Sequence, residues 1–264
     1  TVVDALRMKD EFEGGSALEK EDIGEDDLER LVIEQIEFCN IVLLNKADLV
    51  SAEELERVRQ IVRALQPQAE IIPCNYGDVP LEKILHTHMF DFERVATSAA
   101  WISEIENHHE EEHHHHHHEH HDGHHCHDEH CHCHHHHGDG EALEYGIDTF
   151  VYYRRRPMDM GRFDHFVARK WPRSIIRAKG ICYFRGEKDT CYVFEQAGQQ
   201  VQMRNAGQWY ATMPQEELQM MLERDAALRR DWDEEYGDRM QKIVFIGQQM
   251  DKQEIIRQLD ECLA

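Results

Sequence analysis

The sequence predicts an α/β fold in its first hundred residues and a smaller α+β unit at its C-terminal end. Short apolar runs alternate with amphipathic stretches through residues 1–100, a pattern typical of a parallel sheet. Residues 104–140 hold 19 of the chain's 22 histidines among acidic residues, so they cannot form a packed core. We therefore expect an α/β part at 1–100, a disordered histidine-rich linker at 101–144 and an α+β domain at 145–264.

The first part is expected to alternate strands with helices. Residues 1–5 form the end of a strand, followed by an acidic loop. The apolar run at 40–44 is continuous, which favours a strand covered on both faces. Ser51 is a natural N-cap for a helix, and Pro80 stands where the first turn of a further helix would begin. The remaining elements are expected as helices at 26–38 and 51–65 and a strand at 69–74.

The last part is expected to be mostly antiparallel. Residues 146–156 alternate apolar and polar side chains as a strand does, and residues 161–171 have helical spacing. Turn residues at 186–189 and 197–198 separate successive strands. These patterns predict strands at 174–184, 191–196, 201–213 and 242–246, with helices at 215–232 and 251–263.

The charge of the chain excludes some partners. The formal net charge is −24, and residues 1–145 carry 34 acids against 10 bases, whereas residues 146–264 carry 19 of each. The first part therefore offers no basic surface to neutralise phosphates along a duplex, and we expect no nucleic-acid partner. Apolar runs of about 18 residues do not occur, so we expect no membrane span.

The eight cysteines favour thiols and metal ligands over a disulfide framework, because three of them stand close together beside histidines. We therefore expect a reducing, cytoplasmic setting. Cys182 and Cys191 flank a predicted hairpin turn and are interpreted as core thiols. Thr1 stands inside an apolar run instead of a start methionine, so we expect a chain truncated at its N-terminus.

A guanine-recognition signal follows the apolar strand at 40–44. Asn45, Lys46 and Asp48 stand where the carboxyl end of a strand in an α/β sheet presents residues to a ligand. A carboxylate at Asp48 can accept from both the N1 and the exocyclic N2 hydrogens of guanine, a pairing that adenine lacks. Asn45 would meet the acceptor edge of the base, Lys46 would lay its stem beside it, and the loop 74–77 would close the pocket. A plain polar turn before a helix remains the alternative.

The linker is a candidate metal site. Six nitrogen or sulfur ligands occur within eight positions, and four of them can converge on one tetrahedral ion. Flanking histidine runs add equivalent donors, so several exchanging sites are expected for zinc, nickel, cobalt or copper. Binding should weaken as pH falls through the ordinary imidazole pKa of about 6.5. A solvated spacer that grew by repeat expansion is the alternative. The six ligands are Cys126, His127, His130, Cys131, His132 and Cys133.

Residues 154–179 carry nine basic and two acidic residues, opposite in sign to the first part. An electrostatic seam between the two parts is one interpretation, with Arg154, Arg155 and Arg156 as its residues. Ordinary outward-facing charges are the other.

The wider sequence resembles a known family. Residues 1–5, 35–49 and 67–72 resemble consecutive segments of the nucleotide-binding domain of the CobW family of metal-chaperone GTPases. Residues 146–152, 155–157, 176–180, 196–198 and 237–247 resemble that family's C-terminal domain in order and spacing. The resemblance implies a partial P-loop GTPase-like sheet, binding of GTP and of zinc or in some members cobalt, and hydrolysis that gates metal delivery to a client protein. Asn45, Lys46 and Asp48 inherit the guanine-binding role.

The sequence departs from the family at the phosphate site. It has no GxxxxGK loop, no Ser or Thr after such a lysine to hold Mg²⁺, and no CxCC metal motif. All three lie upstream of Thr1 in the family. We therefore expect a GTPase in the intact protein and a fragment that neither holds triphosphate tightly nor hydrolyses it.

Two other functions remain open. In the first, the linker is a metal buffer and its affinity ignores nucleotide. In the second, the C-terminal sheet is a protein-interaction module. Nucleotide-dependent metal affinity would separate the chaperone from both alternatives.

Overall fold

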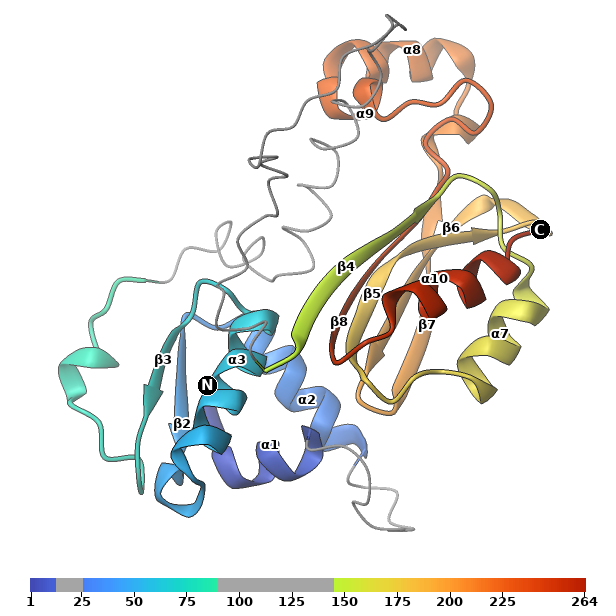
Figure 1. The fold of residues 1–264 in the computed structure, drawn as a ribbon. Helices are drawn as coiled ribbons and strands as arrows, with labels where there is room; N and C mark the ends of the chain where they lie inside the picture. The colour runs from blue at the N-terminus through green and yellow to red at the C-terminus, as the bar shows by residue number, and fades with distance from the viewer. Residues whose placement is uncertain (13–25, 90–144) are drawn as a thin grey trace, which may run out of the picture.

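The computed structural model describes residues 1–12, 26–89 and 145–264 (Figure 1). In its first part, three strands form a parallel sheet in the order β1-β2-β3. This is the α/β arrangement that the sequence predicted. The elements are β1 (Val2–Asp4), α1 (Ala5–Phe12), α2 (Asp26–Glu37), β2 (Ile41–Asn45), α3 (Ala52–Leu65) and β3 (Glu70–Pro73).

The helices pack on one face of this sheet. Val42 and Leu44 of β2 are fully buried in a core with Ile33 of α2 and Ile61 of α3. Their neighbours along β2, such as Leu43, are only half-buried. The expectation of a strand covered on both faces was therefore wrong for the described residues, because α1, α2 and α3 contribute to the same core.

Two further expectations for this part were wrong. Helix α1 begins directly after β1, where a loop was expected, and its Met8 enters the core. The helix expected to begin at Pro80 is a single 3-10 turn, η2 (Leu81–Lys83). Another 3-10 turn, η1 (Ala47–Leu49), follows β2. The N-cap at Ser51 is confirmed, since its hydroxyl accepts from the Glu54 N–H in a capping box.

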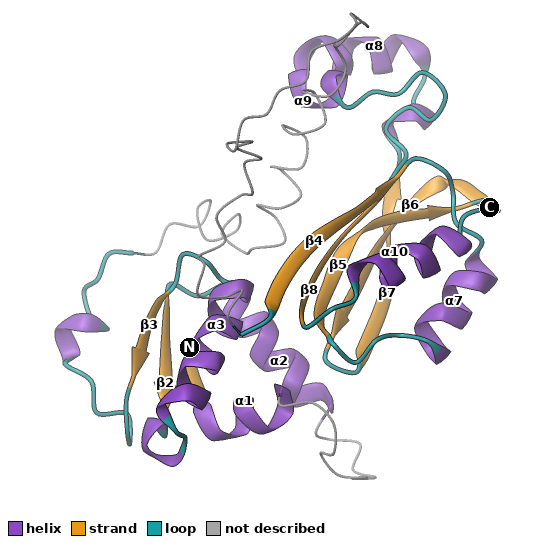
Figure 2. Ribbon diagram, viewed as in Figure 1, coloured by secondary structure: helices purple, strands orange, loops and turns teal. Residues whose placement is uncertain are grey.

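The last part is a five-stranded antiparallel sheet in the order β4-β8-β5-β6-β7 (Figure 2). Two helices, α7 (Met160–Arg169) and α10 (Lys252–Glu261), pack on one face through Phe163 and Leu259. Two short helices, α8 and α9, stand apart from the sheet (Figure 1). The remaining elements are β4 (Ile147–Arg154), β5 (Ile175–Phe184), β6 (Glu187–Ala197), β7 (Gln200–Gln208), η3 (Tyr210–Thr212), α8 (Gln215–Arg224), α9 (Ala226–Arg230) and β8 (Gln241–Gln248).

Strand β8 is buried on both faces, since its alternate side chains enter different cores. Ile243 and Phe245 pack with α7 and α10, whereas Val244 and Ile246 join the core of the first part. The neighbouring β5 approaches β8 so closely that a Cβ on Gly180 would lie 2.0 Å from the Lys242 carbonyl oxygen. Only glycine fits there.

Some boundaries of the last part differ from expectation. The helix expected at 215–232 is divided at Asp225, whose side chain accepts from the Leu228 N–H and starts α9. The strand expected to reach 213 ends at Gln208, and η3 follows. The fold class itself, a partial parallel sheet with a separate α+β unit, is confirmed.

A buried ion pair joins the two parts. The Arg177 guanidinium on β5 donates from Nε and Nη2 to the two Glu37 carboxylate oxygens at the end of α2, at 2.7 and 3.0 Å. Both side chains are 1% exposed or less. Gln66 donates to the Glu37 carbonyl oxygen at 2.6 Å, and Glu195 lies 3.8 Å from Arg177. An electrostatic contact between the parts therefore exists.

The residues named for that contact from sequence were wrong. Arg154 forms a two-point pair with Asp260 of α10, at 2.8 and 2.9 Å. Arg155 and Arg156 donate to backbone carbonyls, including those of Asp231 and Ala264. All three arginines are thus used inside the C-terminal unit.

Candidate functional site

The carboxyl ends of β1, β2 and β3 meet at one edge of the parallel sheet. Asp4, the last residue of β1, stands in register with Asn45, the last residue of β2. The Cys74 N–H, just after β3, donates to the Leu44 carbonyl oxygen at 2.9 Å. The ends of all three strands therefore contribute to the same place, as the carboxyl ends of strands in α/β sheets do for ligands.

Asn45 is held by the loop after β3. Its Oδ1 accepts from the Gly77 N–H at 3.0 Å and from the Cys74 thiol at 3.8 Å. Burial raises the pKa of this thiol, so it stays protonated as a donor. Because Oδ1 is engaged, the Nδ2 group is left as a donor, and it has no partner among the described residues.

The Asp48 backbone is fixed by the same loop while its carboxylate stays open. The Asp48 N–H donates to the Asn75 side-chain oxygen at 2.9 Å, and the Ala47 N–H donates to the Cys74 carbonyl oxygen at 3.2 Å. The side chain of Asp48 is exposed. Within the described parts of the chain its carboxylate has no hydrogen-bond or ion-pair partner. It is therefore free to accept from a ligand.

Lys46 extends toward the opposite side of the edge. Its backbone is left-handed, with φ 60° and ψ 33°, and its ammonium lies 2.5 Å from Asp4 Oδ2. Asp4 also accepts from the Arg7 N–H at 3.1 Å. Partial burial raises the pKa of the Asp4 carboxyl, but the bond and charge of Lys46 together with the bond from the Arg7 N–H outweigh burial and leave that pKa below its ordinary value. The ammonium is therefore anchored to β1.

Asp4 was missed by sequence reasoning. Its side chain reaches Lys46 across 42 residues, and no local spacing joins the two. The available signal was position, because Asp4 ends an apolar strand just as Asn45 does. The loop 74–77, which was expected to close the base pocket, contacts Asn45 through the two bonds to Oδ1. Its closing of a pocket stays a prediction.

The arrangement offers one anionic acceptor, on Asp48, and one amide donor, on Asn45, at the carboxyl end of the same strand of the sheet. A planar ligand with adjacent N–H donors and a nearby acceptor satisfies both groups, and the guanine edge has this pattern. The adenine edge does not, because it lacks a donor at N1.

The metal ligands expected at Cys126, His127, His130, Cys131, His132 and Cys133 lie outside the described residues. In the described ranges, no three histidine, cysteine, aspartate or glutamate side chains gather in a way that could hold a metal ion. The same ranges contain no helix long and apolar enough to cross a membrane. Cys182 and Cys191 are free thiols, and burial raises the pKa of Cys191 to about 11.

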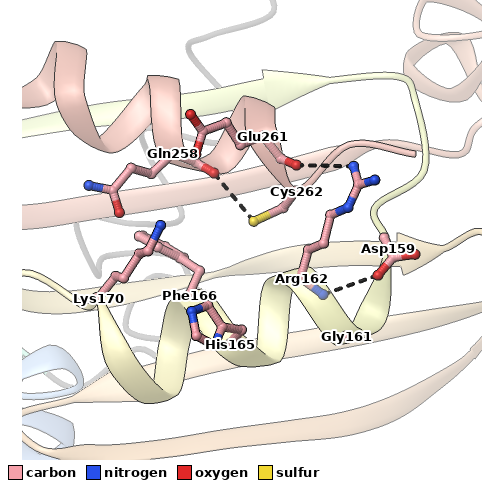
Figure 3. A pocket seen from close by; sticks show the side chains of 9 residues that line it. All are labelled: Asp159, Gly161, Arg162, His165, Phe166, Lys170, Gln258, Glu261 and Cys262. Carbon is pink, nitrogen blue, oxygen red and sulfur yellow. Dashed lines mark hydrogen bonds between the residues drawn. The ribbon is translucent and has the colours of Figure 1, made fainter.

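A hollow of about 380 Å³ lies between α7 and α10 (Figure 3). His165 and Cys262 both line it, a neighbourhood that sequence spacing did not indicate. The Cys262 thiol donates to the Gln258 carbonyl oxygen at 3.3 Å, and burial raises its pKa to about 11. A thiolate nucleophile needs the opposite shift. The hollow therefore holds no activated cysteine.

Comparison with known proteins separates the chain into two matched regions. Residues 1–73 match the CobW/HypB/UreG nucleotide-binding domain, and residues 147–263 match the cobalamin synthesis protein cobW C-terminal domain. The chain belongs to the CobW family. The first match ends at Pro73, where β3 ends, and the second begins with β4, so each sheet belongs to one of the two family domains.

One curated relative aligns with the whole chain. It is the zinc-regulated GTPase metalloprotein activator 1 of Dictyostelium discoideum, 28% identical over 272 residues that cover 100% of this chain and 51% of that protein. The chain thus spans about half the length of this relative. Crystal structures of Zn(II)-bound YjiA GTPase from E. coli and of a Zn(II)-bound triple mutant align with 14% identity and TM-scores of 0.36 and 0.37. Each alignment covers 100% of this chain and 60% of the other.

Proposed function

We propose that this chain is part of a GTP-dependent zinc chaperone, and that its parallel-sheet edge recognises guanine. The observation that carries the proposal is that one edge holds both an open Asp48 carboxylate and an Asn45 Nδ2 group left as a donor, because Asn45 Oδ1 accepts from the Gly77 N–H. Both groups stand on backbone that the loop after β3 holds in place. Recognition groups fixed before binding lose little entropy when a ligand arrives.

In the proposed complex the Asp48 carboxylate accepts from N1–H and from the exocyclic N2–H of guanine. The Asn45 Nδ2 group donates to the acceptor edge of the base, and the Lys46 stem lies along one face. Two hydrogen bonds to a charged acceptor give strong discrimination, because a base without those donors leaves the carboxylate unpaired.

Zinc is the proposed cargo, and Cys126, Cys131 and Cys133 with the neighbouring histidines are its proposed ligands. Zinc is favoured over cobalt and nickel because the curated relative is named as zinc-regulated. A metal-receiving protein is the proposed partner, in line with the word activator in that name. Mg²⁺ would accompany the nucleotide phosphates, and the proposed location is the cytoplasm.

A base-specificity exchange tests the guanine site. Asp48→Asn replaces an acceptor by an amide that can donate to the carbonyl at position 2 of xanthine. We expect the variant to bind GDP about 10-fold or more weakly and xanthosine diphosphate more tightly than the parent chain does. Asp78→Asn is the matched control, because Asp78 is an exposed carboxylate next to Gly77. Unchanged preference in the Asp48 variant would exclude this site, and unfolding cannot produce an exchange of preference.

A further inference from the structure

Tyr76 is the most exposed large apolar side chain among the described residues. It is 94% exposed and stands in the loop after β3, between two residues that hold the guanine-recognition edge. Asn75 accepts from the Asp48 N–H, and Gly77 donates to Asn45. An aromatic ring in full contact with water contributes nothing to the core, so packing does not explain its presence.

The backbone of Tyr76 is also unfavourable. Its φ is 53°, in the left-handed region that glycine adopts freely and that a bulky side chain adopts at a cost. The next residue, Gly77, has φ 70°, so the loop contains a residue suited to this conformation directly beside one that is not. Strain of this kind at an exposed position is common where a side chain serves a ligand.

The strand order determines which side of the base Tyr76 would face. The recognition groups Asn45 and Asp48 follow the middle strand, β2. Lys46 is drawn toward β1 by Asp4, whereas Tyr76 follows β3 on the other side. A planar base whose edge meets the groups after β2 therefore has one face toward Lys46 and the other toward Tyr76.

We propose that Tyr76 stacks on the face of the guanine base opposite Lys46 and closes the base pocket. This inference rests on the proposed guanine site and adds a residue to it. A base held between an aliphatic stem and an aromatic ring loses its contact with water on both faces, while its edge is identified by Asp48. Stacking accepts any base, so Tyr76 supplies affinity and Asp48 supplies specificity.

The test is a titration of the full chain with two nucleotides, GDP and inosine diphosphate, which lacks the exocyclic N2 group. Binding is monitored by the NMR chemical shifts of the backbone amides, and the nucleotide concentration is raised into the millimolar range. Tyr76→Phe should keep the affinity for GDP within about 2-fold, whereas Tyr76→Leu should weaken it about 5- to 100-fold. Stacking predicts that Tyr76→Leu weakens both nucleotides by the same factor. Tyr210→Leu, at a partly exposed tyrosine of the C-terminal unit, is the control and should change neither.

Tyr76→Gly separates a binding role from a structural one. Glycine removes the backbone strain, so the thermal midpoint of the free chain should stay equal or rise while GDP affinity falls. A lower midpoint together with lost binding would overturn the proposal and would make Tyr76 a loop-supporting residue. So would a GDP-to-inosine diphosphate ratio that falls toward one in Tyr76→Leu, because Tyr76 would then act by placing Asp48.

The failures of the two proposals differ. If Asp48→Ala weakens GDP and Tyr76→Leu does not, stacking is wrong and the guanine site stands. If the parent chain shows no GDP-dependent shift, or if Asp48→Ala leaves GDP affinity unchanged, the guanine site itself is wrong, and the stacking role falls with it.

Discussion

Removing the Arg177 guanidinium should destabilise the chain more than removing its partner Glu37. In Arg177→Met, the Glu37 carboxylate is left 0% exposed and without its two charge-assisted bonds. Breaking a buried pair in this way costs about 3–5 kcal/mol. In Glu37→Met, Arg177 retains the Gln196 carbonyl oxygen at 3.3 Å and Glu195 at 3.8 Å, so the loss should be smaller.

The double variant Glu37→Met with Arg177→Met supplies the decisive comparison. Two apolar side chains of similar length replace two charges, so the desolvation cost of the pair is removed together with its attraction. The double variant should therefore be more stable than Arg177→Met alone. The double-mutant cycle should give a coupling free energy of about 3 kcal/mol between the two positions.

Urea unfolding at neutral pH measures these free energies. Arg30→Met is the matched control, because Arg30 pairs with Glu34 at 2.7 Å on the same helix α2 but both side chains are partly exposed. Its loss should be about 0.5 kcal/mol or less. The reasoning is refuted if Arg177→Met lowers the free energy of unfolding no more than Arg30→Met does. It is also refuted if the loss in the double variant equals the sum of the losses in the two single variants.

Three further predictions concern other contacts. Burial raises the pKa of Glu195, but Lys179 and the neighbouring arginines outweigh burial and leave that pKa low. The ionised carboxylate of Glu195 therefore stabilises the fold above about pH 4.5, and this stability is lost as pH falls through the lowered pKa. In acid, the urea midpoint should therefore fall more steeply with pH for the parent chain than for Glu195→Gln. Asp4→Asn keeps an acceptor for the Arg7 N–H but releases the Lys46 ammonium. GDP affinity should therefore fall about 2- to 5-fold in a calorimetric titration. An unchanged affinity would mean that guanine binding does not require the bond from Lys46 to Asp4. Ser51→Ala removes the α3 cap and should cost about 1 kcal/mol by thermal melting, with Ser174→Ala as a control outside any helix.

The candidate site was largely predictable because its main signal is local. An apolar strand followed by Asn45, Lys46 and Asp48 gives both the strand end and the side chains that stand there. The contact from Lys46 to Asp4 was not predictable, since it depends on β1 and β2 being parallel neighbours in register. The buried pair of Glu37 with Arg177 spans 140 residues and required both sheets to be placed.

The errors have physical causes of the same kind. Helix α1 has only eight residues, too few to be stable alone, and it forms because Met8 is buried and Lys9 lies 3.4 Å from Glu54 of α3. The partners of the arginines at 154–156 could not be predicted from the sequence, because these partners, among them Asp260, are about a hundred residues away.

Coupling between guanine recognition and metal binding is what a nucleotide-gated zinc chaperone requires. Calorimetric titration of zinc into the chain, first without nucleotide and then with saturating GDP, measures that coupling most directly. If the chain is part of such a chaperone, GDP should change the zinc dissociation constant about 5-fold or more, and zinc should change the GDP dissociation constant by the same factor. Equal zinc affinities in the two titrations would contradict gated delivery and would leave a histidine-rich metal buffer joined to a guanine-binding edge.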